Sequence, residues 1–209
     1  MISHEPQVFV VDDDPSVQRS ICRLLRTAGL SAQTFSSPKE FLDGEVPAGA
    51  TGCVVLDVRM PGMSGLDLQE ELQRRGVRLP IVFITGHGTI PMSVRAMKQG
   101  ALDFLEKPFK SESLIEVIRK AIRRSQETAA EEHERLDLVK KFESLAPRQR
   151  EVFQRVVTGK LNKQIALELG IVEKTVKLHR ARVMKKMQAG SLAELVQLAE
   201  RLNLIPPSH

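Results

Sequence analysis

The sequence predicts two domains: an α/β domain built on a doubly wound, five-stranded parallel sheet, followed by a small all-α domain of four helices. Three observations support this prediction. Up to about residue 124, five short apolar runs alternate with five segments of helical periodicity, as in a parallel sheet covered by helices. From residue 144 onward every apolar pattern is helical. The net charge also rises, from +1 in residues 1–124 to +7 in residues 144–209.

The five strands are predicted from short runs of β-branched and other apolar residues. Cys53 to Leu56 are apolar without polar alternation, which favours a strand buried on both faces. Charged or turn-forming residues end most of these runs. The predicted strands are Gln7–Val11, Gln33–Phe35, Cys53–Asp57, Ile81–Ile84 and Leu102–Glu106.

The helices between the strands are predicted from apolar residues at helical spacing and from the signals at their ends. Asp14 and Ser37 each precede a proline, a combination that caps and begins a helix. Glycines follow three of the predicted C-termini. The predicted helices are Pro15–Ala28, a short helix through Phe41 and Leu42, Leu66–Arg75, Pro91–Gln99, and a last helix that Ser111 caps.

The segment 125–143 is charged and contains neither Gly nor Pro. We expect a helical linker that continues the preceding helix, with a disordered charged spacer as the alternative. The expected organisation is therefore a domain over residues 1–124, a linker over 125–143 and a domain over 144–209.

The C-terminal domain is predicted to contain a helix-turn-helix, because two of its short helices are joined by a turn at Gly170. Asn162 is expected to cap the first of these two helices. The four predicted helices are Pro147–Thr158, Lys163–Leu169, Glu173–Met187 and Leu192–Leu202.

The composition is that of an ordinary globular protein, with 42% hydrophobic and 27% charged residues. No apolar signal segment and no apolar run of bilayer length occurs, so we expect a cytoplasmic protein without a membrane partner. The two cysteines, Cys22 and Cys53, provide neither a disulfide framework nor a metal-binding spacing.

Polar side chains follow four of the predicted strands. Asp12 and Asp13 end the first strand, Asp57 the third, Thr85 the fourth and Lys107 the fifth. The carboxyl ends of parallel strands share one edge of the sheet, where α/β folds bind ligands. Carboxylates ~4 Å apart repel by about 4 kcal/mol at an effective dielectric of ~20. A hard cation would relieve this repulsion, and oxygen ligands suit Mg²⁺.

Such a site could carry out phosphoryl transfer. Asp57 could attack a phosphoryl group and hold it as an acyl phosphate, while Lys107 and magnesium neutralise the phosphoryl oxygens. Thr85 could donate a hydrogen bond to one of those oxygens. Each residue also has an ordinary structural role open to it: a helix cap for Asp12 to Asp14, surface charge for Lys107 and a turn for Thr85. The combination favours the site.

The strings VVDDD, VVLDVRMPGMSG, VFITGHG and LDFLEKPF resemble the receiver domain of two-component response regulators, which has the CheY-like fold. The resemblance covers residues 6 to about 124. It implies that Asp57 is the phosphoacceptor, that Asp12 and Asp13 form an acidic pocket, that Thr85 is the switch hydroxyl and that Lys107 binds phosphate.

The resemblance also implies a Mg²⁺ site in this acidic pocket, with Asp13, Asp57 and the backbone carbonyl of Arg59 as ligands and Asp12 beside them. Phe104 stands at the position of the switch aromatic residue. A cis peptide bond is implied before Pro108. Arg59 and His87 would flank the site and tune the lifetime of the phosphorylated form.

The third predicted helix of the C-terminal domain is strongly basic. A solvated charged face is the ordinary explanation, but this is also the second helix of a helix-turn-helix, which enters the major groove of DNA. Its basic residues, with no acid between them, are Lys174, Lys177, Arg180, Arg182, Lys185 and Lys186, and His179 lies among them.

Residues Ser144 to Met187 resemble the LuxR-type DNA-binding domain, and the whole chain is similar to the FixJ-like subgroup of response regulators. By position, Lys177 and Leu178 should face bases, with Thr175, His179 and Arg182 nearer the phosphate backbone.

This chain departs from the LuxR-type pattern at several positions. Ala146 and Val172 replace residues that usually cap helices, and Gln149 replaces a usual Glu. The loss of a cap costs about 1 kcal/mol. Ala181 lies where some relatives have a base-contacting lysine, so target specificity does not transfer.

The resemblance implies a response regulator that is phosphorylated by a partner histidine kinase. The modification would shift a two-state equilibrium through Thr85 and Phe104. The helix from Pro91 and the strand Leu102–Glu106 would form a homodimer face. The dimer would place two recognition helices on promoter DNA, with RNA polymerase as a further partner.

Two other functions remain open. A magnesium-dependent phosphohydrolase would use Asp57 as its nucleophile, but such enzymes need a second acid two residues later, where Arg59 stands. A DNA-binding protein whose receiver domain only dimerises would not need the set of acids, threonine and lysine. We therefore expect a regulator and not an enzyme.

Overall fold

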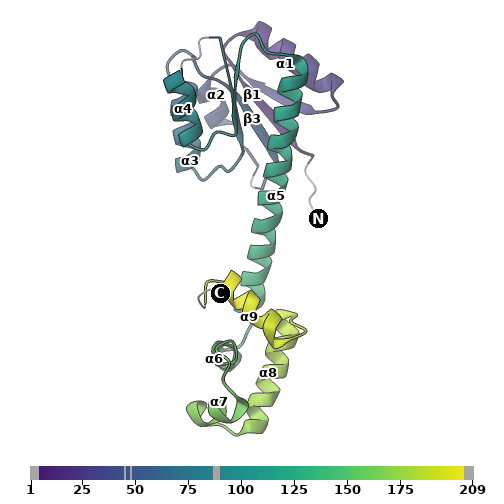
Figure 1. Ribbon diagram of the computed structural model, residues 1–209, viewed down its shortest axis with the longest axis vertical. Coiled ribbons are helices and arrows are strands. Elements are labelled where there is room, and N and C mark those ends of the chain that lie inside the picture. The colour runs from purple at the N-terminus through teal and green to yellow at the C-terminus, as the bar shows by residue number, and fades with distance from the viewer. Residues whose placement is uncertain (1–4, 45, 48, 87–89, 205–209) are drawn as a thin grey trace. The chain divides into compact units, whose positions relative to one another are not determined.

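The computed structural model describes residues 5–44, 46–47, 49–86 and 90–204 (Figure 1). The chain divides into two compact units, one up to Ala129 and one from Ala130 onward. The described residues contain no helix with both the length and the apolarity needed to cross a bilayer.

The first unit is built on a five-stranded sheet in which every pair of neighbouring strands is parallel. The strand order is β2-β1-β3-β4-β5, so the chain reverses its direction of winding at the boundary between β1 and β3. Ligands of such sheets bind beyond the carboxyl ends of the strands at this point. The strands are β1 (Gln7–Val11), β2 (Ser31–Phe35), β3 (Gly52–Asp57), β4 (Ile81–Thr85) and β5 (Asp103–Glu106).

Helices cover both faces of the sheet, as the doubly wound prediction requires. Alternate residues of the strands point to opposite faces: Phe9 and Val11 pack with α2, α3 and α4, whereas Val8 and Val10 pack with α1 and α5. Figure 1 shows helices on both sides of the sheet. The helices are α1 (Pro15–Thr27), α2 (Pro38–Asp43), α3 (Gly65–Arg74), α4 (Ile90–Lys98) and α5 (Ser111–Glu143).

The predicted N-caps of α1 and α2 are confirmed. The Oδ1 atom of Asp14 accepts a hydrogen bond from the N–H of Ser16 at 2.7 Å, and the Oγ atom of Ser37 accepts one from the N–H of Glu40 at 3.1 Å. Ser111, expected as a cap, is instead the first residue within α5.

The segment 125–143 is helical, as predicted, because α5 runs unbroken through it over 33 residues. Its two ends take part in different cores. The Oγ atom of Ser125 accepts a buried hydrogen bond from the N–H of Gly52 at 3.1 Å, while Leu138 packs in the core of the second unit.

The second unit contains α6 (Pro147–Val156), α7 (Asn162–Leu169), α8 (Glu173–Met187) and α9 (Leu192–Arg201) around one apolar core. Its largest fully buried side chain is Phe153, whose ring meets that of Phe142 edge to face at 5.3 Å. Gly170 ends α7 in the left-handed conformation, with φ of 63°, and so turns the chain toward α8.

The prediction that Asn162 caps α7 is wrong, because the N-cap is Leu161 and Asn162 is the first helical residue. The side-chain oxygen of Gln164 accepts a hydrogen bond from the N–H of Leu161 at 2.8 Å. This backbone N–H therefore has a partner although the N-cap residue has no polar side chain. The side chain of Asn162 is instead bound by Arg180, at 3.3 Å.

Candidate functional site

Lys107 brings two of the predicted acids together at the carboxyl edge of the sheet. Its Nζ atom lies 2.7 Å from Oδ2 of Asp12 and 2.8 Å from Oδ1 of Asp57. These acids come from the ends of the neighbouring strands β1 and β3, at the switch point of the sheet. Asp12 is 1% exposed and Asp57 is 6% exposed. Two buried carboxylates therefore share one ammonium group.

The remaining carboxylate oxygens are bound by the local backbone. The N–H of Asp14 donates to Oδ1 of Asp12 at 2.9 Å, and the N–H of Arg59 donates to Oδ2 of Asp57 at 2.7 Å. Each acid is thus held by the turn that follows its own strand, which leaves little freedom for its side chain.

Two residues that the sequence analysis did not single out support this pocket. The amide Nε2 of Gln18 donates to the backbone carbonyls of Asp12 and Phe35, at 2.6 and 3.0 Å. Gly65 lies so close to β3 that a Cβ atom there would be 2.2 Å from the carbonyl oxygen of Asp57. In the sequence, Gly65 indicates a loop. Only the fold shows that the backbone of Asp57 lies against it.

Burial and the ion pairs act in opposite directions on the protonation of the pocket. Burial raises the pKa of Asp57, although the hydrogen bond from Lys107 opposes this. Burial disfavours the charged form of Lys107 as well, but the hydrogen bonds to Asp12 and Asp57 outweigh it and raise the pKa of the lysine. The ammonium group therefore stays charged beside the acids at neutral pH.

The donors in this pocket fit Mg²⁺, because carboxylate oxygens are its preferred protein ligands. Within the described residues, no three His, Cys, Asp or Glu side chains are arranged to hold a metal by themselves. Asp13 and Arg59 are both exposed beside the pocket. Mg²⁺ usually keeps several waters and takes only one or two carboxylates, so the ligand set of Asp13, Asp57 and the Arg59 carbonyl stays a prediction.

The predicted switch residues lie on the two strands beyond Asp57. Thr85 ends β4 and is 1% exposed, and its carbonyl oxygen accepts a hydrogen bond from the N–H of Lys107 at 2.7 Å. Phe104 is partly buried in β5, with its ring centroid 6.2 Å from that of Phe83. The peptide bond before Pro108 is cis, as expected. His87 lies outside the described residues.

The basic helix predicted in the C-terminal domain is α8. It buries Val176, Val183 and Met187 in the core of the second unit. Thr175, His179 and Arg180 are partly exposed. The exposed members of the predicted DNA-contacting set are Lys174, Lys177, Leu178, Arg182, Lys185 and Lys186. One face of α8 therefore presents cationic side chains to solvent while the other holds the domain together.

Three of the predicted DNA-contacting cations have partners inside their own domain. Lys177 pairs with Glu173, one turn earlier, at 3.2 Å. Arg180 donates to Oδ1 of Asn162 in α7, and Lys186 donates to the carbonyl oxygen of Ser144 at 2.6 Å. Arg180 and Lys186 thus connect α8 to other parts of the domain, a role that the charge pattern alone did not reveal.

The departures from the usual helix caps have the expected local effect. Ala146 and Val172 stand at the N-caps of α6 and α8, and neither makes a side-chain cap hydrogen bond. At α6, Oε1 of Gln149 accepts a hydrogen bond from the N–H of Ala146 at 3.0 Å, so the reciprocal half of a capping box survives.

Comparisons with known proteins agree with both parts of this geometry. Residues 8–119 match the family described as response regulator receiver domain, and residues 143–199 match that described as bacterial regulatory proteins, luxR family. Nodulation protein W of Bradyrhizobium diazoefficiens is 49% identical over 197 residues, which cover 94% of this chain and 86% of that protein.

Two further relatives span nearly the whole chain. Transcriptional regulatory protein FixJ of Azorhizobium caulinodans is 45% identical, covering 95% of this chain and 94% of that protein. The structure of the response regulator StyR is similar with a TM-score of 0.87 and 47% identity, covering 95% of this chain and all of that one. The chain therefore belongs to the two-component response regulators, in the FixJ-like group that joins a receiver domain to a LuxR-type DNA-binding domain.

Proposed function

We propose that this chain is a transcription factor switched by phosphorylation: Asp57 accepts a phosphoryl group from a histidine kinase, the chain dimerises, and α8 binds promoter DNA. The observation that carries the proposal is the double contact of Lys107 with Asp12 and Asp57, at 2.7 and 2.8 Å. A buried pair of acids around one lysine suits a site that handles an anionic group.

In the proposed transfer, a carboxylate oxygen of Asp57 attacks the phosphorus of a phosphohistidine on the kinase. The P–N bond breaks and its electron pair stays on the imidazole nitrogen, so the product is an acyl phosphate on Asp57. Lys107 offsets the charge of the phosphoryl oxygens throughout. A magnesium ion bound by Asp13, Asp57 and the Arg59 carbonyl, beside Asp12, would supply further charge neutralisation.

The phosphoryl group would then act on the neighbouring strands. The hydroxyl of Thr85 would turn to a phosphoryl oxygen, and Phe104 would move inward behind it. Phe104 lies in β5, which packs against α4, and Val94 and Met97 of α4 are each 46% exposed and offer an apolar surface for a second copy. The α4–β5 face is therefore our proposed homodimer interface.

Dimerisation would couple this switch to DNA. Two copies of α8 can read two half-sites of a pseudo-palindromic promoter, which raises affinity without any new contact in each half. Lys177 and Leu178 would face the bases, while Lys174, Arg182 and Lys185 would contact phosphates. RNA polymerase would be the partner that reads the bound dimer, and the cytoplasm is the compartment where all these partners meet.

The alternative of a phosphohydrolase has less support. Arg59 stands two residues after Asp57, and its backbone N–H holds the carboxylate while its side chain is exposed. No acid occupies the position where such an enzyme places its proton donor. We therefore propose that the acyl phosphate is a stored signal and not a step of rapid turnover.

Intact-protein mass spectrometry tests the chemistry directly. With acetyl phosphate and magnesium, the wild-type chain should gain one phosphoryl group that hydroxylamine removes, as expected of an acyl phosphate. Asp57→Asn should gain none. Lys107→Met should gain it more slowly, because the attacking site would lose its cation. Phosphorylation of Asp57→Asn to the wild-type level would refute the assignment of Asp57.

A further inference from the structure

Helix α4 is held to the receiver domain with little apolar burial. Among its described side chains, over residues 91–98, only Ala96 is buried, whereas Val94 and Met97 are each 46% exposed. The neighbouring helix α3 buries three leucines. Because hydrophobic stabilisation scales with buried apolar area, α4 is the less firmly anchored of the two.

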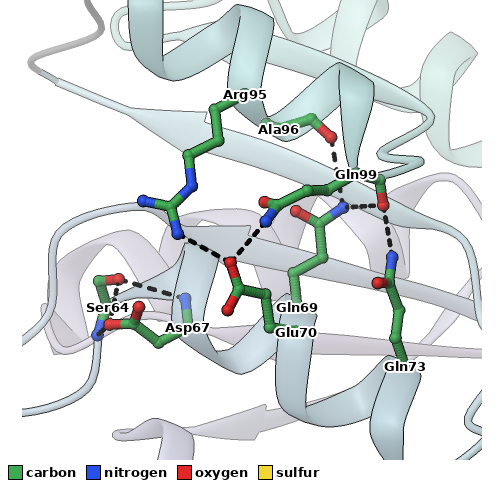
Figure 2. A network of polar contacts seen from close by, with 8 residues as sticks. All are labelled: Ser64, Asp67, Gln69, Glu70, Gln73, Arg95, Ala96 and Gln99. Carbon is green, nitrogen blue, oxygen red and sulfur yellow. Dashed lines mark hydrogen bonds and ion pairs between the residues drawn. The ribbon is translucent and has the colours of Figure 1, made fainter.

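Polar side chains of α3 reach the C-terminal end of α4 (Figure 2). The amide Nε2 of Gln69 donates to the backbone carbonyls of Ala96 and Gln99, at 3.3 and 2.9 Å. Gln73 Nε2 donates to the same Gln99 carbonyl at 2.5 Å. The last carbonyls of a helix lack partners within the helix. The Ala96 carbonyl also accepts a hydrogen bond from the N–H of Ala101 at 3.0 Å, so the main contribution of α3 is the pair of donors to the Gln99 carbonyl.

A second contact between the same helices is ionic. Oε1 of Glu70 accepts hydrogen bonds from Arg95 Nη2 at 2.7 Å and from Gln99 Nε2 at 2.5 Å (Figure 2). We call the side chains of Gln69, Glu70, Gln73, Arg95 and Gln99 the α3–α4 bridge.

The α3–α4 bridge is incompletely satisfied. The Oε1 atoms of Gln69 and Gln99 are buried and have no hydrogen-bond partner in the described part of the chain. Gln69 as a whole is only 1% exposed. A buried acceptor without a donor destabilises the state that buries it. Separation of α4 from α3 would give both oxygens access to water. The unpaired oxygens therefore reduce the net free energy by which the bridge favours contact between the two helices.

We propose that Gln69 is a positioning residue: through the α3–α4 bridge it holds α4 against α3 in the unphosphorylated chain, and release of this bridge frees α4 to form the dimer. α4 lies against β5, which carries Phe104, so movement of that strand reaches the bridge. This inference rests on the proposed function for its link to dimerisation, but the holding role of the bridge stands on the contacts alone.

The holding role is tested by amide hydrogen exchange on the full-length chain without phosphodonor. Gln69→Met keeps the length and apolar volume of the side chain but removes its two donated bonds and its unpaired oxygen. Exchange of the α4 amides should become several-fold faster in this variant while that of α1 stays unchanged. Unchanged exchange in α4 would overturn the proposal.

The link to dimerisation is tested in the Asp57→Asn background, where phosphorylation is removed. Sedimentation should show several-fold tighter self-association for Asp57→Asn/Gln69→Met than for Asp57→Asn. Ser125→Ala in the same background is the matched control, since it removes a buried hydrogen bond between α5 and β3 that includes no residue of α3 or α4, and it should not promote dimerisation. Equal self-association of all three would overturn the link, as would an equal gain in the control.

Glu70→Gln offers a second variant that leaves the buried core untouched, because this side chain is 43% exposed. It removes the ion pair with Arg95 and should raise self-association in the same direction, by a smaller factor. A wild-type chain that fails to dimerise with acetyl phosphate would refute the proposed function. Faster α4 exchange in Gln69→Met would still support the holding role in that case.

Discussion

At the scale of single residues, the pocket of Asp12, Asp57 and Lys107 keeps charged groups in a buried place, at a cost in stability. Asp57 is buried and shares Lys107 with Asp12, so two carboxylates and one ammonium group lose much of their hydration, which costs desolvation free energy. The raised pKa of Asp57 reports this cost, because burial favours its neutral form.

Asp57→Asn should therefore increase the free energy of unfolding at neutral pH. A folded pKa above the unfolded value of about 3.9 means that this group stabilises the fold below that pH, and that the contribution is lost as pH rises through the folded pKa. Urea unfolding at pH 7 should favour the variant, and its advantage should disappear below about pH 4. A variant less stable than wild type at pH 7 would contradict this account.

Gly65→Ala should disrupt the same pocket through the backbone. The new Cβ would lie 2.2 Å from the Asp57 carbonyl oxygen, so β3 or the start of α3 must move. We expect a loss of about 1–3 kcal/mol in unfolding free energy, and slower phosphorylation. Gly86→Ala is the matched control, because a Cβ there has no neighbour within 4 Å and its stability should change by less than about 1 kcal/mol. Equal losses in the two variants would contradict the steric explanation.

At the scale of elements, α8 both packs in the core of its domain and presents cations to solvent. Its inner face packs in the domain core, and its outer face carries the exposed cations. The N-termini of α8 and α9 differ in whether a side chain caps the helix. Val172 at the N-cap of α8 makes no side-chain hydrogen bond, whereas the Oγ of Ser191 at the N-cap of α9 accepts one from Glu194 N–H at 3.1 Å.

Val172→Ser should stabilise the C-terminal domain by about 1 kcal/mol, since Val172 already has the extended conformation of a cap residue and is 68% exposed. Ser191→Ala should cost about the same amount, because it removes an existing cap. Thermal unfolding of the full-length chain measures both. The interpretation fails if Val172→Ser is destabilising while Ser191→Ala is neutral.

Local signals account for most of what the sequence predicts correctly. The caps at Asp14 and Ser37 and the polar ends of β1, β3, β4 and β5 depend on neighbouring residues only, so they could be predicted. The predicted N-cap of α7, Asn162, is one position too late. Two adjacent residues could act as the N-cap, and the hydrogen bond from the N–H of Leu161 to Gln164 selects Leu161. These cases show that short-range hydrogen bonding limits the accuracy of helix boundaries.

Long-range contacts explain what could not be predicted. Gln18 and Gln69 bind backbone carbonyls 17 or more residues away, and nothing in their sequence neighbourhood distinguishes them from surface glutamines. Ser125 likewise lies in a charged segment, yet its hydroxyl binds Gly52 in the receiver core. Polar side chains that connect a helix to the sheet or to another helix can therefore be identified only in the folded chain.

At the scale of the whole molecule, charge is divided between the two parts of the chain. Residues 144–209 carry a net charge of +7, against +1 for residues 1–124. Cations on α8 should therefore dominate the encounter with DNA, and release of counterions should make binding strongly dependent on salt.

Lys177→Ala should lower DNA affinity, because the proposed complex loses a cation that faces the bases, and it should make the dependence of log affinity on log salt less steep. Lys39→Ala, an exposed lysine of the receiver domain, is the matched control and should change neither quantity. Fluorescence anisotropy over a series of salt concentrations makes the measurement. Identical slopes and affinities for both variants and the wild type would exclude Lys177 from the interface.

The most direct test of the central claim measures the molar mass of the protein in solution and its affinity for DNA. Both are measured for wild type and Asp57→Asn, before and after treatment with acetyl phosphate and magnesium. The DNA is a duplex selected from random sequences by the phosphodonor-treated wild type. We expect the donor to produce a dimer and tighter DNA binding in the wild type only. Strong binding that ignores the donor, or an equal response in Asp57→Asn, would contradict a switch that operates through Asp57.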